Sequence, residues 1–286
     1  IQAARPASAR PFSKIPLTGW KAALALGAAL LPLWIGFLIP AIVLVELATS
    51  GSGGMGGGVE RLLALSGNSL LAGMLAGSLA VAVALTLAYG KRLRPTQLNR
   101  TVVRIASTGY AIPGSVIAVG LLLSFASLDR LLGAGWTWMT GRSVGMILSG
   151  TLSALIMAYL VRFLAVAFGS VDASLSSVTR NMDEAAMGLG HTFRRILWNV
   201  HLPMVSPSMF AALLLVFVDV IKELPATLIV RPFGFDTLAI EVYRMASDER
   251  LAEASGAALA IVAVGLLPVV LLSRQIRGVS ASRRGP

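Results

Sequence analysis

The sequence predicts an all-α, polytopic membrane protein with about six transmembrane helices. Of its 286 residues, 56% are hydrophobic and 13% are charged, whereas an average soluble domain has about 25% charged residues. The mean hydropathy is +0.80. A membrane helix needs about 20 mostly apolar residues, and six runs meet or approach that length: Ala22–Val45, Leu62–Tyr89, Ile105–Leu128, Val144–Val161, Met204–Val218 and Ala254–Ser273.

The basic residues predict how these spans are oriented, because lysine and arginine accumulate in cytoplasmic loops. If the N-terminus is cytoplasmic, the inner segments hold 17 of the 24 basic residues and the outer segments hold 6. We therefore expect both termini to be cytoplasmic. Apart from Lys222, which lies within a span, the basic residues outside the inner segments are Arg61, Arg130, Arg142, Arg231, Arg244 and Arg250.

The two ends of the chain are expected to lie outside the membrane domain. Residues 1–20 are rich in Pro, Arg and Ser and lack the apolar core of a signal peptide, so we expect a cytoplasmic linker. Residues 21–275 are the expected transmembrane domain, and residues 276–286 a cytoplasmic tail. Because the chain starts at Ile1 with a linker-like stretch, we expect it to be a fragment or the second half of a longer protein.

Composition also argues against several kinds of site. With no cysteine and two histidines, disulfides and thiolate or His-based metal sites are not expected. The glycine-rich stretch Gly51–Gly58 lacks the preceding strand and the Lys-Ser/Thr ending of a nucleotide loop, so a flexible linker is expected. The net charge of +11 is spread between apolar runs, which favours a lipid bilayer over nucleic acid as the partner.

One compact polar segment, residues 183–203, interrupts the apolar sequence; we call it the EAA segment. Its residues predict two short helices joined at a turn. Ala185 and Ala186 allow close approach of another surface, while Gly188 and Gly190 weaken the first helix and Gly190 favours a turn. We expect the second helix, Phe193–His201, to be capped by Thr192, to direct Arg194 and Arg195 away from its apolar face, and to stop at Leu202 and Pro203.

Two interpretations of this segment follow from the residues alone. The first is an amphipathic helix on the inner leaflet, with its arginines on lipid phosphate. The second is a docking element for a cytoplasmic protein. The spacing Glu184-Ala185-Ala186, then Gly190, then Val200-His201-Leu202-Pro203 resembles the EAA loop of binding-protein-dependent ABC importer permeases, with Val200 where isoleucine is more usual.

The resemblance implies a type I importer permease of the bacterial inner membrane, fed by a periplasmic binding protein. It implies that the EAA segment is a coupling helix that docks on a separate ATPase subunit, which uses ATP-Mg while this chain binds no cofactor. Glu184 would pair with basic groups of that subunit, Ala185 and Ala186 would allow close contact, and Gly190 would make the turn. No Walker sequence occurs in the chain, so we do not expect it to be an enzyme.

A second polar group lies near the outer end of the fifth span. Asp219, Lys222 and Glu223 follow the i, i+3, i+4 spacing of one helix face, and Pro225 breaks the helix after them. Charges at this depth usually face a protein interior or a watery cavity. They are expected either to fix helix packing by ion pairs or to line the substrate path or outer gate. Pro113 and Gly114, expected to kink the third span, are further candidates for that path.

The stretches KELPATL, RPFGFDTLA and ASDERLAEA, together with GYAIPG at residues 109–114, resemble ferric-iron importer permeases. In these proteins two homologous six-span halves are often fused, and this chain is most similar to the C-terminal half. The resemblance implies a second permease half, either fused or homodimeric. Relatives that carry thiamine, polyamines, sulfate or phosphonates share the fold and the EAA loop, so they stay open as alternatives.

Charged residues of the outer segment allow two interpretations. Their carboxylates are the hard oxygen ligands that Fe³⁺ prefers, but arginines are interleaved with them. We therefore favour a docking surface for the periplasmic binding protein, formed by Asp248, Glu249 and Arg250, over a metal site. An ATP-independent channel or secondary transporter is the alternative of a different class; it predicts buried charges in several spans rather than in the fifth alone.

Overall fold

A computed structural model describes residues 16–50, 58–143 and 145–282, which form helices and turns without a strand. Six helical stretches among them are long and apolar enough to cross a membrane, as the sequence predicts. They are Trp20–Thr49, Gly58–Leu93, Gly114–Thr140, Leu152–Ser177, Phe193–Ile221 and Leu251–Leu271. Most of the Gly51–Gly58 stretch and of the expected linker 1–20 lies outside the described residues.

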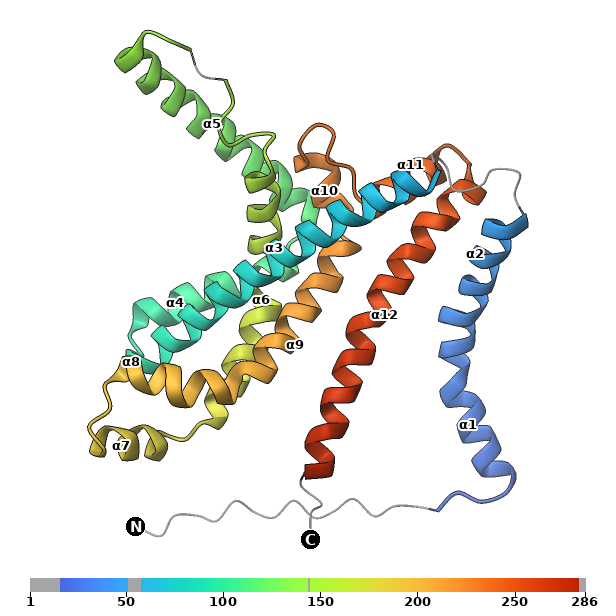
Figure 1. Cartoon of the computed structure of the whole chain (residues 1–286), viewed down its shortest axis with the longest axis horizontal. Coiled ribbons are helices and arrows are strands. Elements are labelled where there is room, and N and C mark those ends of the chain that lie inside the picture. Colours follow the sequence, from blue (N-terminus) through green and yellow to red (C-terminus); the bar gives the residue numbers. More distant parts are fainter. Residues whose placement is uncertain (1–15, 51–57, 144, 283–286) are drawn as a thin grey trace.

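Figure 1 shows long helices joined by short helical pieces. The first half of the chain contains α1 (Trp20–Leu33), a π-helical turn (Trp34–Leu38), α2 (Ile39–Ser50), α3 (Gly58–Leu93), α4 (Gln97–Ala106), a 3₁₀ turn (Gly109–Ala111) and α5 (Gly114–Thr140). The second half contains α6 (Leu152–Ser177), α7 (Arg180–Gly188), α8 (Phe193–Ile196), a π-helical turn (Leu197–His201), α9 (Leu202–Ile221), α10 (Pro225–Val230), α11 (Leu238–Ser247) and α12 (Leu251–Ser282).

Helices α3, α6 and α9 form the central bundle, and small residues on α3 let the other two approach. A stripe of alanines at every fourth position of α3 is at most 1% exposed, so one face of the helix is buried in this core. In membranes such small residues stabilise helix association through close backbone packing rather than through a hydrophobic driving force. The stripe consists of Ala72, Ala76, Ala80, Ala84 and Ala88.

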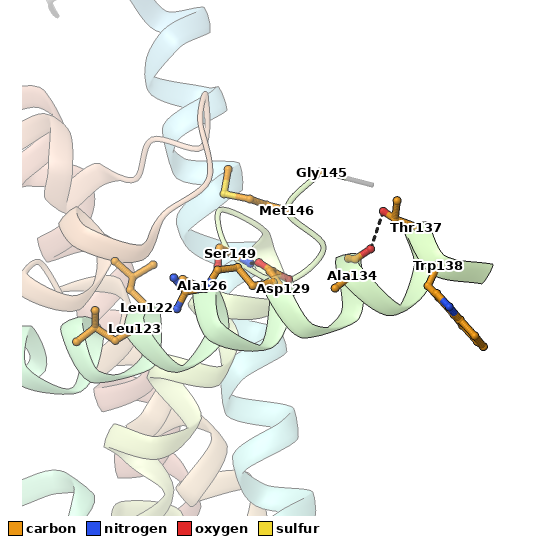
Figure 2. A pocket seen from close by; sticks show the side chains of 12 residues that line it. Leu122, Leu123, Ala126, Asp129, Ala134, Thr137, Trp138, Gly145, Met146 and Ser149 are labelled. Carbon is orange, nitrogen blue, oxygen red and sulfur yellow. Dashed lines mark hydrogen bonds between the residues drawn. The ribbon is translucent and has the colours of Figure 1, made fainter. Parts of the chain in front are cut away.

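Further helices lie outside this bundle. Helix α12 packs against α2 and α11, and α1 contributes no buried residue (Figure 1). Helix α5 projects away from the bundle, and the chain returns along it because Asp129 accepts hydrogen bonds from the backbone N–H groups of residues 147, 148 and 149, at 3.1, 2.8 and 2.8 Å. Along this return lies an apolar hollow of about 1090 Å³, between Leu122 and Trp138 (Figure 2).

The expected third span was misplaced by about nine residues. Ile105 belongs to α4, and the spanning helix begins only at Gly114. Pro113 therefore does not kink the span but stands at its N-terminal boundary. The physical reason is that a residue before proline avoids the helical region, and Ile112 accordingly has ψ of 133°.

The fourth span also differs from the expectation, because it runs from Leu152 to Ser177. The sequence interpretation ended it at Val161 because Arg162 follows, and counted that arginine as cytoplasmic. In the structure Arg162 lies in the interior of α6 and pairs with Glu223 of the α9 end, which compensates its charge. The basic residues still favour the same orientation without Arg162.

Gly77 tests the close packing between α3 and α9. A Cβ added there would lie 3.2 Å from the Leu213 backbone oxygen, whereas one added at Gly67 meets nothing within 4 Å. Gly77→Leu should therefore lower the free energy of unfolding by about 1–3 kcal/mol through overpacking, measured by thermal unfolding in detergent. Gly67→Leu on the same helix is the control, and equal melting temperatures for both variants would contradict this packing.

Candidate functional site

The EAA segment forms two helices joined by a tight turn, as the sequence predicts. Helix α7 ends at Gly188, and Gly190 adopts φ of +82°, a left-handed conformation that glycine favours. The His191 N–H donates to the Ala186 oxygen at 3.1 Å and the Gly190 N–H donates to the Met187 oxygen at 2.9 Å. This pair of hydrogen bonds is the Schellman helix ending, so the predicted turn at Gly190 is confirmed.

The second helix does not stop at Leu202 and Pro203, contrary to the sequence expectation. One helical stretch runs from Phe193 to Ile221, through a π-helical turn at Leu197–His201. Pro203 has no N–H to donate, and the wider turn just before it accommodates that missing hydrogen bond. Thr192 has the extended backbone of a cap, but its side chain makes no capping hydrogen bond. The EAA segment therefore continues directly into the central bundle.

The predicted motif residues divide between an outer and an inner face of the EAA segment. Ala186 is buried, at 8% exposure, while Glu184 and Ala185 are exposed on α7. Gly188, Gly190, Arg194, Arg195 and Pro203 are exposed as well, and Leu202 is half-buried. The outer face thus offers one carboxylate, small residues and two arginines, a chemistry that suits a protein partner.

Three residues that the sequence interpretation did not select hold the inner face in place. Asp183 of α7 accepts hydrogen bonds from Arg92 at the end of α3, at 2.6 and 3.1 Å. Its other oxygen lies 2.7 Å from Nε2 of His201, which is 2% exposed. We call this group the Asp183 clamp. It joins α7 to both α3 and the start of α9, and the separation of 91 positions between Arg92 and Asp183 hid it from sequence analysis.

Further hydrogen bonds fix the arginine of the clamp. Arg92 Nη1 donates to the backbone oxygens of Leu175 and Val178, both at 2.9 Å, so the guanidinium also closes the C-terminal end of α6. The Tyr89 hydroxyl donates to the Phe193 oxygen at 3.0 Å, and its ring meets that of His201 edge-on at 5.6 Å. The EAA segment is thereby fastened to all three helices of the central bundle.

The clamp also sets the ionisation of Asp183. Burial raises the pKa of this carboxyl, but the hydrogen bonds from Arg92 and His201 outweigh burial, and the pKa lies below its ordinary value. A carboxyl with a lowered pKa stabilises the folded state above its unfolded pKa. That contribution is present at neutral pH and is lost only as the pH falls below about 4, the ordinary aspartate range.

A second group of interactions lies inside the membrane domain. Nε of Arg162 is 3.1 Å from Oε2 of Glu223, which is 6% exposed, and Nη1 of Arg162 donates to the Ile112 oxygen at 3.0 Å. The Ala226 N–H donates to the other Glu223 oxygen at 3.3 Å. Gly114 leaves room for this pair, because a Cβ there would lie 3.0 Å from Nη1 of Arg162.

The structure brings only part of the expected path together. Glu223, Gly114 and the backbone before Pro113 meet around Arg162, and Pro225 begins α10 just beyond. Asp219 and Lys222 instead form their own pair at 2.9 Å, and the Lys222 side chain is 62% exposed. The three charges expected on one face of the fifth span therefore form two separate ion pairs.

Asp248, Glu249 and Arg250 are exposed, and Glu249 has an unusual backbone. Its φ of +59° is the only positive value among the described residues other than glycine. The Arg250 N–H donates to the Met245 oxygen at 2.9 Å and the Glu249 N–H donates to the Ala246 oxygen at 3.2 Å, which is again a Schellman ending, here after α11. Asp248 caps α11, and Arg250 pairs with Glu253.

Three of the acidic residues between positions 236 and 253 each contact an arginine. Buried Glu241 pairs with Arg61 at 3.1 Å and with Arg244 at 2.7 Å. Asp236 pairs with Arg231, as Glu253 does with Arg250. In these three residues an arginine balances the carboxylate charge, and the pairs fix the local structure of this surface.

Comparison with known proteins agrees with this architecture. Residues 80–284 match the family described as the binding-protein-dependent transport system inner membrane component. The chain belongs to this family. It is thus a multi-pass ABC importer permease of the inner membrane, and the resemblance drawn from the EAA spacing is confirmed.

The names of curated relatives give different transported substrates. The chain is 28% identical over 268 residues to the Fe(3+)-transport system permease protein FbpB 2 of Haemophilus influenzae, a match that covers 93% of the chain and 49% of the relative. It is 26% identical over 164 residues to the putative 2-aminoethylphosphonate transport system permease protein PhnV of Salmonella typhimurium, covering 57% of the chain and 56% of the relative. The permease therefore spans about half the length of these relatives.

Among solved structures, a bacterial alginate ABC transporter in complex with an alginate pentasaccharide-bound periplasmic protein has the same fold. The TM-score is 0.65 at 20% sequence identity, over 91% of the permease and 96% of that chain. At this identity the likeness concerns the fold.

Substitutions at the neighbouring residues Asp183 and Glu184 distinguish the role of the clamp from that of the exposed face of α7. Asp183→Asn removes the negative charge of the carboxylate that contacts Arg92 and His201. Hydrogen bonds to charged groups contribute about 1.5–3 kcal/mol to the stability of the folded state. Thermal unfolding of the purified permease should show a loss of that order. Glu184→Gln, on the exposed face, should leave the melting temperature unchanged. If both variants melted like the unaltered permease, the clamp would not be a stabilising element.

The Arg162–Glu223 pair is testable by a double-mutant cycle. Arg162→Gln should lower the free energy of unfolding by about 3–5 kcal/mol, because it leaves the Glu223 carboxylate buried without its partner. Adding Glu223→Gln should restore part of that stability. Equilibrium unfolding of the two single variants and the double variant gives the coupling energy, and strictly additive losses would show that the two charges do not interact.

Proposed function

We propose that this permease moves ferric iron into the cytoplasm and is driven by a separate ATPase that docks on the EAA segment. The observation that carries the coupling part is the continuous helix from Phe193 to Ile221. A subunit that displaces the exposed face of α7 acts on a rigid lever that enters the central bundle. Rigid elements with two arrangements are what transmit such changes through proteins.

The outer face of the EAA segment supplies the contacts. Glu184 pairs with basic groups of the ATPase, and Ala185 lets its surface come close because the methyl group is exposed and small. Arg194 and Arg195 extend the contact on the second helix. The turn at Gly190 sets the angle between the two helices, and its φ of +82° disfavours any side chain there. ATP-Mg is used by the partner, and this chain supplies no catalytic group.

We favour ferric iron as the cargo because the match to the Fe(3+) permease extends over 93% of the chain. The match to the phosphonate permease extends over 57%, so phosphonate is the second candidate. Glu223 acts as a gate residue, since the Arg162–Glu223 pair holds the start of α5 against α6 and α10. Asp219 and Lys222 lie on the path beside it as a separate ion pair. Opening the outer gate requires that this pair separate or move as a unit.

The exposed surfaces support proposals for the remaining partners. A periplasmic binding protein docks at Asp248, Glu249 and Arg250, on the side opposite the EAA segment; the alginate transporter of the same fold is itself in complex with a periplasmic protein. A second permease half covers the projecting α5 and its apolar hollow of about 1090 Å³. With the EAA segment facing the ATPase, both termini of the permease are cytoplasmic.

Substrate identity is tested by transport into proteoliposomes that contain the purified complex with its ATPase and binding protein. Ferric iron should be accumulated in an ATP-dependent manner, while 2-aminoethylphosphonate, thiamine and spermidine should not. Uptake of the phosphonate without uptake of iron would reassign the cargo and leave the coupling part intact. ATP-independent uptake of any of these compounds would instead support the channel or secondary-transporter alternative.

The docking parts have their own measurement. Affinity purification of the permease should retrieve an ATPase with Walker sequences, and Glu184→Arg should weaken that association about tenfold, because two like charges would then meet in the contact. The double variant Glu249→Gln, Arg250→Gln should retain the ATPase but lose stimulation by the binding protein. Unchanged stimulation would contradict docking of the binding protein at Asp248, Glu249 and Arg250.

A further inference from the structure

A basic cavity lies beside the EAA segment, at the ends of α3 and α6 that are expected to be cytoplasmic. Its volume is about 410 Å³, and it includes the basic side chains of Lys91, Arg92, Arg100 and Arg180 together with one carboxylate, Asp172. We call it the basic cavity. It collects side chains from α3, α4, α6 and α7, so it exists only in the folded permease.

Two of these basic groups are already neutralised and two are not. Lys91 lies 3.0 and 2.8 Å from the Asp172 oxygens, and Arg92 belongs to the Asp183 clamp. The side chains of Arg100 and Arg180 make no ion pair with any residue that the structure describes, and both residues are exposed. The cavity therefore carries a net positive charge and presents two guanidinium groups without an anionic partner.

The deeper lining of the cavity is apolar. Ala88, Leu175 and Val178 are 1%, 2% and 2% exposed and form the part nearest the central bundle. The spanning stretches end at Leu93 and Ser177, so Lys91 and Arg92 lie just before the end of one span and Arg180 lies just beyond the end of the other. A cationic cavity at the level where two spans end lies at the height of the phospholipid headgroups.

We propose that the basic cavity binds the phosphate group of an anionic phospholipid of the inner leaflet. Guanidinium groups bind phosphate oxygens in bidentate geometry, which makes Arg100 and Arg180 the main ligands. The position of the cavity at the ends of two spans favours a lipid headgroup over a free phosphate ion.

The site has a consequence for the EAA segment. Arg180 is the first residue of α7, and Arg92 lies in both the cavity and the clamp. A phosphate at this place binds next to the positive end of the α7 helix dipole. The bound lipid thus stabilises α7 in the orientation seen here, so the lipid composition of the membrane tunes how firmly the EAA segment is held.

The test uses the assembled permease–ATPase complex in nanodiscs of neutral phosphatidylcholine, to which a fluorescent phosphatidylglycerol is added. Binding is read by energy transfer from a donor label on the complex. Removing both charges with Arg100→Gln and Arg180→Gln should weaken phosphatidylglycerol binding about 30-fold, and each single variant about fivefold. The control is Arg94→Gln, which should leave binding unchanged. Arg94 is an exposed arginine between α3 and α4 that does not line the cavity.

Three outcomes would overturn the proposal. Equal binding by the double variant and the unaltered complex places the lipid elsewhere. Full displacement of the lipid by millimolar inorganic phosphate shows a free-anion site. Stronger lipid binding by the permease without its ATPase shows that an acidic group of the partner occupies the cavity. The paired lysine substitutions Arg100→Lys and Arg180→Lys retain the charge and should give intermediate binding, which separates loss of a ligand from loss of folding. None of these readouts depends on the cargo or on transport.

Discussion

The carboxylate of Asp183 is the contact on which the arrangement of the EAA segment depends. One of its oxygens is held by Arg92 of α3 and the other by His201 at the entrance to α9. This carboxylate joins α7 to two parts of the membrane domain at once. With it, the buried face of α7 is fixed, and the opposite face, with Glu184 and Ala185, is free for a partner.

Charge inside the membrane domain follows a similar logic. Arg162 and Glu223 are costly individually in a medium without water, and each is present because the other compensates it. Their pairing connects the interior of α6 with the end of α9, and Gly114 leaves the space that the pair occupies. The same pair therefore explains why an arginine interrupts the fourth span and why a glycine begins α5.

Local patterns were sufficient for the features that depend on neighbouring residues. The six spans, the turn at Gly190 and the motif spacing all follow from hydropathy, backbone freedom and short-range order, and the structure agrees with them. The boundaries of the third and fourth spans did not follow, because hydropathy cannot distinguish Ile105 before a proline break from a spanning residue. Nor does it show that Arg162 has a partner 61 positions away.

Long-range contacts account for what the sequence could not reveal. Asp183 and His201 stand within or beside the motif, but only the folded chain shows that Arg92 meets them. Pro203 was expected to stop a helix because proline usually does so. The π-helical turn before it, at Leu197–His201, permits the continuous lever instead. The helix boundary that was wrongly expected at Pro203 is thus the one that matters most for the proposed coupling.

In the proposed coupling, the EAA segment and α9 move as one rigid body. The chain has no cysteine, so spin labels can be placed on exposed Asn181 of α7 and exposed Phe210 of α9 by Asn181→Cys and Phe210→Cys. Their distance distribution is then measured by pulsed electron spin resonance in the assembled complex, with and without ATP. A rigid body gives one narrow distribution that ATP leaves unchanged, and a distribution that broadens or shifts on ATP binding would contradict rigid coupling.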